Sequence, residues 1–364
     1  MPIAADATIT QLDEIVAELP FEERALFERI FHVSVTYGEL VPPDEMHPWI
    51  ERQFGSVEAT RVQKIVRVTN NVTLDGVMFN YLRSNRPMWR SHDLDLEEEL
   101  RQNLADPFSD PYRSTPADPF GRVRGRFCVT AANIAKFDGF HAVIVFDEPH
   151  PLRFAREDLH DYIDTGTRWA MAAHAYDPEA RYYLFIWNCL WRAGASLLHG
   201  HAQVMLGRDV HYAAVEKLRR NALMYEASFR QNYFEDLFRV HQSAGCAFEV
   251  DGVRVFANLA PVKENEILLI APALSPMLKD RLYDALDCLR QGLNVTSFNV
   301  AIYQSPIAPT EENWEGFPVI VRIVDRGDPT SRTADIGAME LYAASVVSSD
   351  PLRLARLLRE HMST

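Results

Sequence analysis

The spacing of hydrophobic positions changes along the chain and predicts a helical start followed by a larger strand-rich body. In residues 8 to about 55, apolar positions recur at helical spacing, at Leu12, Ile15, Val16, Leu19, Leu26, Ile30 and Phe31. Pro20, Pro42 and Pro43 interrupt this run. We therefore expect residues 1–60 to form a helical N-terminal extension that packs on the main body or on a second subunit.

After residue 60 the pattern becomes that of short strands separated by helices, and it occurs twice. Asp75-Gly76 is a hairpin signal. The strand His141–Phe146, the helix Arg153–Tyr176 and the strands Tyr182–Trp187 and His199–Leu206 form the first set. The second set is predicted at 266–270, 276–293, 298–303 and 319–324, after a long helix over residues 211–240. Repeated units of this kind predict an α+β fold of two halves, residues 61–210 and 211–364, with helices on one face of antiparallel sheets.

Composition and charge exclude several classes of function. The 364 residues suffice for two hydrophobic cores, and no apolar run is long enough for a membrane-spanning helix. The N-terminus lacks the pattern of a secretory signal, and the four cysteines are scattered, so we expect a cytoplasmic protein with reduced thiols. A net charge of −14 argues against nucleic-acid and membrane partners. The local basic cluster of Arg122, Arg124, Arg126 and Lys136 fits either an anion site or a solvated loop.

The segment His199-Gly200-His201-Ala202-Gln203 carries the candidate chemistry. In a strand, side chains alternate between faces, so His199, His201 and Gln203 are predicted to point into one pocket. A neutral imidazole is a competent nucleophile toward phosphorus near pH 7, and it can divide one difficult transfer into two easier steps. Two alternatives are a pair of hydrogen-bonded core histidines and half of a structural zinc site.

The residues around this segment decide between these readings. Asn188, then Gly194 and Ser196, then His199, His201 and Gln203 have the spacing of an active-site signature, and from about Val68 onward the chain resembles the galactose-1-phosphate uridylyltransferase branch of the histidine-triad superfamily. The resemblance implies that His201 is the nucleophile and that Gln203 bonds the phosphoryl oxygens. It further implies nucleotide or phosphate contacts from Asn188, Gly194, Ser196, His199 and Asn133, without a cofactor.

The function implied by the resemblance is transfer of a nucleoside monophosphate. The donor would be a nucleotide-sugar or dinucleotide, the acceptor a phosphate-bearing molecule, and the intermediate a nucleotidyl-His201. One alternative is a nucleotide hydrolase, although that branch usually has a third histidine where Gln203 stands. The other is a non-catalytic nucleotide-binding protein, which would not need His201. The sequence leaves open the base, the acceptor and whether the protein is a homodimer.

A metal site of the resembled family is predicted to be missing. Relatives bind zinc through two cysteines and two histidines, and the resemblance matches His150 and His199 to those histidines. Phe79 and Leu82 stand in place of the cysteines, and two imidazoles alone make a weak site. The competing expectation is that a carboxylate such as Asp93 or Asp95 completes the site. We predict no bound metal.

Overall fold

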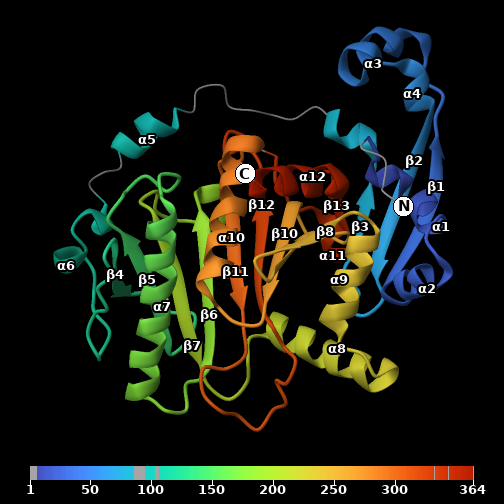
Figure 1. Ribbon diagram of the computed structural model, residues 1–364. Coiled ribbons are helices and arrows are strands. Elements are labelled where there is room, and N and C mark those ends of the chain that lie inside the picture. Colours follow the sequence, from blue (N-terminus) through green and yellow to red (C-terminus); the bar gives the residue numbers. More distant parts are fainter. Residues whose placement is uncertain (1–5, 86–94, 103–105, 332, 343, 364) are drawn as a thin grey trace.

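A nine-stranded sheet runs through the centre of the molecule, and a four-stranded sheet lies beside it (Figure 1). The computed structural model describes residues 6–85, 95–102, 106–331, 333–342 and 344–363. The large sheet has the order β4-β5-β7-β6-β11-β12-β10-β9-β8, and its neighbouring strands are antiparallel. These strands are β4 (Cys128–Ala132), β5 (Phe140–Phe146), β6 (Tyr182–Cys189), β7 (His201–Gly207), β8 (Ala247–Val250), β9 (Val253–Ala257), β10 (Glu264–Ala271), β11 (Phe298–Tyr303) and β12 (Val319–Asp325).

The two ends of this sheet follow the same strand order. From one edge the order is β4-β5-β7-β6. At the other edge, after the outermost strand β8, the order is β9-β10-β12-β11. Helix α7 (Arg156–Tyr176) connects β5 to β6, and α10 (Pro276–Asp287) connects β10 to β11. The two sets join where β6 pairs with β11, with Trp187 opposite Val300. The predicted α+β class is confirmed, and both sets share one continuous sheet.

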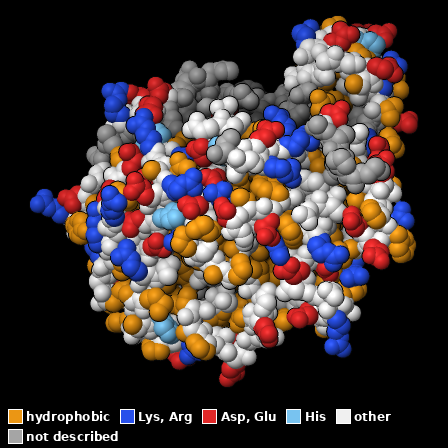
Figure 2. Space-filling view, in the orientation of Figure 1, with side chains coloured by type: hydrophobic (Ala, Val, Ile, Leu, Met, Phe, Trp, Pro, Cys, Tyr) orange, Lys and Arg blue, Asp and Glu red, His pale blue; other side chains and the backbone are white. Residues whose placement is uncertain are grey.

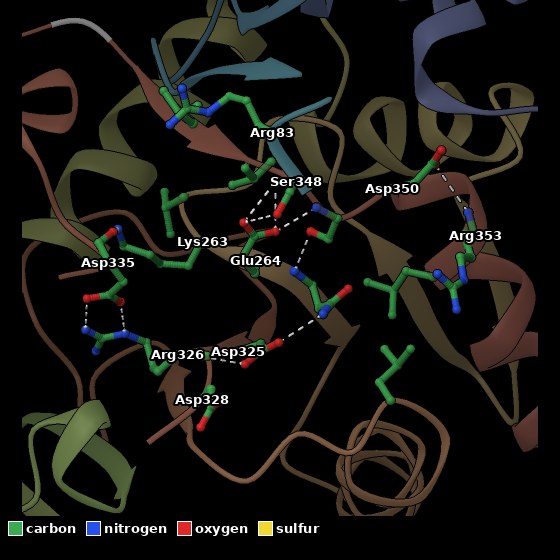
Figure 3. Close-up of a pocket in the computed structure, with 18 of the residues that line it drawn as sticks. Arg83, Lys263, Glu264, Asp325, Arg326, Asp328, Asp335, Ser348, Asp350 and Arg353 are labelled. Atoms are coloured by element: carbon green, nitrogen blue, oxygen red, sulfur yellow. Dashed lines mark hydrogen bonds and ion pairs between the residues drawn. The ribbon is translucent and has the colours of Figure 1, made fainter. Parts of the chain in front are cut away.

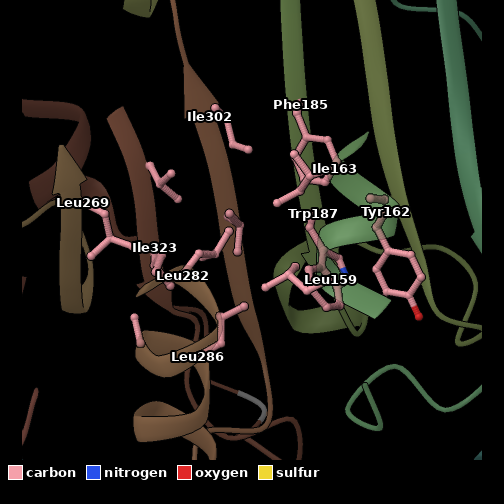
Figure 4. Packing of buried hydrophobic residues seen from close by; sticks show 14 of the residues in the cluster. Leu159, Tyr162, Ile163, Phe185, Trp187, Leu269, Leu282, Leu286, Ile302 and Ile323 are labelled. Carbon is pink, nitrogen blue, oxygen red and sulfur yellow. The ribbon is translucent and has the colours of Figure 1, made fainter. Parts of the chain in front are cut away.

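Helices α7, α10 and α12 (Pro351–Met362) cover one face of the large sheet and form the main core with it. Alternate strand residues fill this core, and Figure 4 shows them packed against α7 and α10. Trp187 is fully buried against Phe146, Phe154 and Phe298. Because side chains alternate between faces, the intervening residues of β6 and β7 point to the opposite face. That face carries the candidate site.

The four-stranded sheet covers the opposite face of the second set of strands. Its order is β1-β2-β3-β13, with β1 (Phe31–Glu39), β2 (Val62–Asn70), β3 (Gly76–Phe79) and β13 (Ser345–Val347). Helices α8 (Ala213–Phe229) and α9 (Tyr233–Ser243) lie next to it. A second core joins these parts through Phe31, Phe79, Phe256, Ile270 and Ile320. The Asp75-Gly76 hairpin was predicted correctly, since β2 and β3 pair antiparallel.

Two predicted helical regions are wrong in part. The N-terminal segment contains α1 (Leu12–Ala17), α2 (Phe21–Ile30), α3 (His47–Phe54) and α4 (Val57–Arg61), but Phe31–Glu39 forms β1, which pairs with β2 along its length. The single helix predicted over 211–240 is two helices. Arg230 adopts a left-handed conformation and Asn232 caps α9, so the chain breaks between them. The domain boundaries at residues 60 and 210 stay predictions.

Helices α3 and α4 lie at the tip of the β1–β2 pair and project from the body at the upper right of Figure 1. The remaining short helices are α5 (Leu96–Gln102), α6 (Pro111–Ser114) and α11 (Ala338–Tyr342). Basic and acidic side chains are interspersed on the face shown in Figure 2. In the part of the chain that the structure describes, no helix combines the length and apolar character needed to cross a membrane.

Candidate active site

The candidate site lies at one end of the strands of the large sheet, where β7 begins and β5 and β6 end. His201 is the first residue of β7 and lies opposite Val145, while Gln203 lies opposite Val143. Ala202 between them is buried in the main core, so His201 and Gln203 share the face that is not covered by α7. The predicted common orientation therefore holds for these two residues.

The imidazole of His201 is held in one tautomer. Its Nδ1 lies 2.8 Å from the carbonyl oxygen of His199 and donates a hydrogen bond to it. In a neutral ring this leaves the lone pair on Nε2. Burial lowers the pKa of His201, and the carbonyl of His199 only partly offsets this effect. The ring is therefore a neutral base at pH 7, and among the described residues its Nε2 has no hydrogen-bond partner, as a nucleophile requires.

His199 lies outside the strand, which begins two residues later than predicted. Its Nε2 is 2.9 Å from the carbonyl oxygen of Phe146 and donates to it, so the side chain turns back toward β5. Gly200 lets the two segments approach, because a Cβ there would lie only 2.7 Å from the Phe146 ring. This close approach is next to the carbonyl of His199, which lies within hydrogen-bond distance of Nδ1 of His201. His199 therefore approaches the site from the bend before β7 and not from the strand itself, and its ring lies against the same Phe108 ring as that of His201.

Gln203 is part of a cluster that the sequence did not predict. Its Oε1 lies 3.0 Å from Nε2 of His141 on β5, a fully buried residue. Burial lowers the pKa of His141, although the contact with Gln203 partly opposes the shift, so this ring too is neutral. Asn133 follows β4 and brings its amide nitrogen to 3.2 Å from the same Nε2. The structure thus brings Gln203 and Asn133 together around His141.

Asn188, Gly194 and Ser196 lie at the end of β6 and in the loop that follows it. Asn188 Oδ1 accepts a hydrogen bond of 2.7 Å from Asn299 on the neighbouring strand β11. Gly194 has a φ of +99°, which favours glycine, and a Cβ at this position would lie 3.8 Å from the amide nitrogen of Asn188. Ser196 is exposed in this loop. The backbone of Gly194 therefore lies close to the amide nitrogen of Asn188, with no glycine side chain between them.

A short segment that the sequence analysis missed packs over the two histidines. The ring of Phe108 stands 5.1 Å from that of His201 and 5.9 Å from that of His199. It also packs on Val129, Ala131, Val143 and Val145, on the same face of the sheet as His201. Asp106 Oδ1 lies 3.6 Å from Nδ1 of His199. No sequence signal marks this segment, because the contact depends on the chain folding back onto a distant strand.

Carboxylates stand beside both histidines of the expected zinc site. His150 Nε2 lies 3.0 Å from Glu97 of α5, and Asp106 approaches His199. Asp93 lies outside the described residues, and Asp95 bonds the first turn of α5. Phe79 is buried in the second core, so it does not fill space between these histidines. The described residues contain no group of three or more candidate ligands, and the absence of metal stays a prediction.

A pocket of about 620 Å³ opens at the same end of the strands, where β10 and β11 begin and β12 ends (Figure 3). Arg326 and Asp335 point toward each other on its wall, with an Nε–Oδ2 distance of 2.7 Å. Glu264 is the first residue of β10, and Lys263 directly precedes it. The lining described for this pocket contains no residue predicted from the motif. Arg326 nevertheless connects it to the site, because it bonds Asn299.

Comparison with known proteins gives the fold. No model of a known protein family matches the chain, and no curated protein matches its sequence. Among solved structures, an ADP-glucose phosphorylase from Arabidopsis thaliana with bound ADP-glucose matches 80% of this chain and 97% of its own, with a TM-score of 0.60 and 17% identity. A GalT-like protein from the same plant gives the same coverage and TM-score at 19% identity. The chain has the fold of the uridylyltransferase-like proteins. A uridylyltransferase also matches over 81% of this chain and 98% of its own, with a TM-score of 0.53 and 14% identity.

This result agrees with the fold implied by the resemblance in the motif. The sequence identities of 14 to 19% are too low to carry a substrate or an activity from these proteins to this chain. The roles of the residues in the uridylyltransferase-like fold must therefore be argued from their own geometry.

Proposed function

We propose that the protein transfers a nucleoside monophosphate from a nucleotide-sugar or dinucleotide to a phosphate-bearing acceptor through a nucleotidyl-His201 intermediate. The observation that carries this proposal is the state of His201. Its Nδ1 is held by the carbonyl of His199 and its pKa is lowered by burial, so a neutral ring keeps its Nε2 lone pair for attack. A protein that only bound nucleotides would not need this arrangement.

The two chemical steps follow from the tautomer. The Nε2 lone pair attacks the α-phosphorus, an N–P bond forms, and the P–O bond to the leaving phosphate breaks with its electron pair on that oxygen. A phosphate leaving group needs no strong general acid. In the second step a phosphate oxygen of the acceptor attacks the same phosphorus, the N–P bond breaks, and His201 returns to its neutral form. The amides of Asn188 and Gln203 would stabilise the charge on the phosphoryl oxygens.

The solved structures of similar fold guide the choice of donor. One of them was obtained with bound ADP-glucose, so ADP-glucose is the first donor to test, with UDP-glucose as the matched uridine compound. Gln203 favours transfer over hydrolysis, because the hydrolytic branch usually has a histidine at this position. Analysis of the products distinguishes transfer of the nucleotide from binding alone.

The test is product analysis with each donor in the presence and absence of inorganic phosphate. We expect a nucleoside diphosphate and a sugar phosphate to form when phosphate is present, and no product from His201→Ala. The matched control is His211→Ala, because His211 is also a buried imidazole but lies against Gln304. Nucleoside monophosphate as the main product would identify a hydrolase. Full activity of His201→Ala would contradict the proposal.

A further inference from the structure

We propose that two hydrogen-bond chains, one from each set of strands, fix which end of the Asn188 and Gln203 amides faces the bound phosphate. This makes Asn299 and His141 positioning residues for the transfer. The inference rests on the proposed function for its role in catalysis, but it can be tested by binding alone. Both chains begin at a group that can only donate, and this determines every later step.

The first chain starts at a guanidinium of the second set of strands. Arg326 Nη1 donates to Oδ1 of Asn299 over 2.6 Å, and a guanidinium has no acceptor. The nitrogen of Asn299 must therefore be its other end, and it donates to Oδ1 of Asn188 over 2.7 Å and to the carbonyl of Ala193 over 2.8 Å. The oxygen of Asn188 is used, and its N–H₂ group is left over Gly194.

The second chain starts at a backbone N–H of the first set. The amide of Phe137 donates to Nδ1 of His141 over 3.1 Å, so the proton of this neutral ring is on Nε2. Nε2–H donates to Oε1 of Gln203 over 3.0 Å. The nearby amide nitrogen of Asn133 cannot accept, and its oxygen is used by Ala135. The oxygen of Gln203 is thus used as well, and its N–H₂ group is left for a ligand.

Phosphate oxygens only accept hydrogen bonds, so the direction of these amides decides between attraction and repulsion. An amide can otherwise rotate by half a turn at little cost and present its oxygen. A hydrogen bond to a charged group contributes enough to change binding by about 10- to 100-fold. Fixing both amides in advance also removes the entropy cost of ordering them when the ligand binds.

The first chain gives the second set of strands a part in the site even though it lacks the two histidines. Arg326 is held in place by Asp335 through Nε and Nη2, and Arg192 bonds the carbonyl of Arg326. Asn299 passes this fixed geometry across the β6–β11 junction to Asn188. The motif residue is therefore oriented from outside the half that carries it.

The decisive experiment compares Asn299→Asp with Asn299→Ala. An aspartate still accepts from Arg326 but cannot donate, so Asn188 is expected to turn its N–H₂ toward Asp and its oxygen toward the phosphate. Alanine only releases Asn188. The measured quantities are the dissociation constants of AMP and UMP and the rate of covalent labelling, which is the rate at which ADP-glucose or UDP-glucose transfers its nucleoside monophosphate to the protein. Asn221→Asp on α8 is the matched control with the same change of charge.

We expect Asn299→Ala to weaken binding of the monophosphate by up to about tenfold and Asn299→Asp by clearly more, while Asn221→Asp resembles the wild type. His141→Phe should weaken binding similarly to Asn299→Ala, and the double variant should show the product of the two effects, since the chains share no residue. Thermal melting verifies the fold of each variant. If Asn299→Asp does not fold, Asn299→Ala is also measured in an Asn188→Ala background, where the inference predicts that it no longer weakens binding.

Equal binding by Asn299→Asp and Asn299→Ala, or wild-type binding by both, would overturn the inference. A wild-type protein that binds a monophosphate but never becomes labelled would refute the proposed function, while the order of the dissociation constants would still decide the inference. Failure of the wild type to bind either monophosphate would refute both.

Discussion

Replacing Phe108 by alanine should change the pH dependence of His201. The ring of Phe108 packs within 5.1 Å of the His201 ring, and burial is the main reason why the pKa of His201 is lowered. Phe108→Ala admits water to the imidazole, so its pKa should rise toward the ordinary value of about 6.5. In the proposed function the neutral ring is the nucleophile, and a lowered pKa keeps it neutral to lower pH. The wild type should therefore stay active below the pH at which the variant begins to lose activity.

The size of the effect can be bounded from ordinary imidazole titration. An imidazole with a pKa near 6.5 is only about one-tenth neutral at pH 5.5. The variant should then retain as little as about one-tenth of its own plateau rate at that pH, and the wild type a clearly larger fraction. The stability cost should be about 1–3 kcal/mol, which is less than the 3–5 kcal/mol of a fully buried phenylalanine, because Phe108 is only partly buried.

The assay is the rate of covalent labelling between about pH 4.5 and 8, with each protein normalised to its own plateau. Phe229→Ala is the control, because Phe229 is a partly exposed ring on α8 that packs against Tyr225. Its profile should match the wild type. A Phe108→Ala profile with the same midpoint as the wild type, or with a lower one, would show that Phe108 does not set the pKa of His201.

Three further predictions follow from individual residues. His241 is fully buried, with its pKa lowered by burial to about 4 and thus below its unfolded value of about 6.5, so the protein should lose up to about 3 kcal/mol of stability as the pH falls between these values. Urea unfolding at several pH values measures this loss, and an equally steep loss in His241→Phe would contradict it. Gln203→His should still become labelled but should pass more of the nucleotide to water, since an imidazole differs from an amide in charge and donors; unchanged partitioning in a single-turnover assay would count against this. Chelation should leave the melting temperature unchanged, because the described residues contain no group of three or more side chains that could hold a metal ion; one zinc per chain with destabilisation on its removal would refute this prediction.

Much of the fold could be predicted because local pattern and final structure agree in the strongly periodic elements. The strand at 140–146, the helix at 156–176 and the strand at 182–189 each bury one regular set of apolar residues against the main core. The strand Phe31–Glu39 was missed because it directly follows α2, whose helical spacing was extended through it. Its alternation of Val33 and Val35 with polar residues only becomes decisive once it pairs with β2.

The sequence pointed to His201 as the proposed nucleophile but not to the residues that surround it. The motif named the residues on β6 and β7, since their spacing is local. His141, Asn299 and Phe108 come from other segments, and only the sheet register and the folded loop bring them to the motif. A signal for Asn299 was present, because it is a polar residue in an otherwise apolar strand. Sequence spacing could not show that it faces Asn188.

The central claim is that His201 carries the nucleotide during transfer. The most direct measurement is the mass of the protein after incubation with ADP-glucose or UDP-glucose, followed by digestion and localisation of the added group. We expect an acid-labile, base-stable nucleoside monophosphate on the peptide that contains His201. Inorganic phosphate or a sugar phosphate should remove it, and His201→Ala should form no such adduct. Turnover of either donor without an adduct on His201, or an adduct of the same yield in His201→Ala, would contradict it.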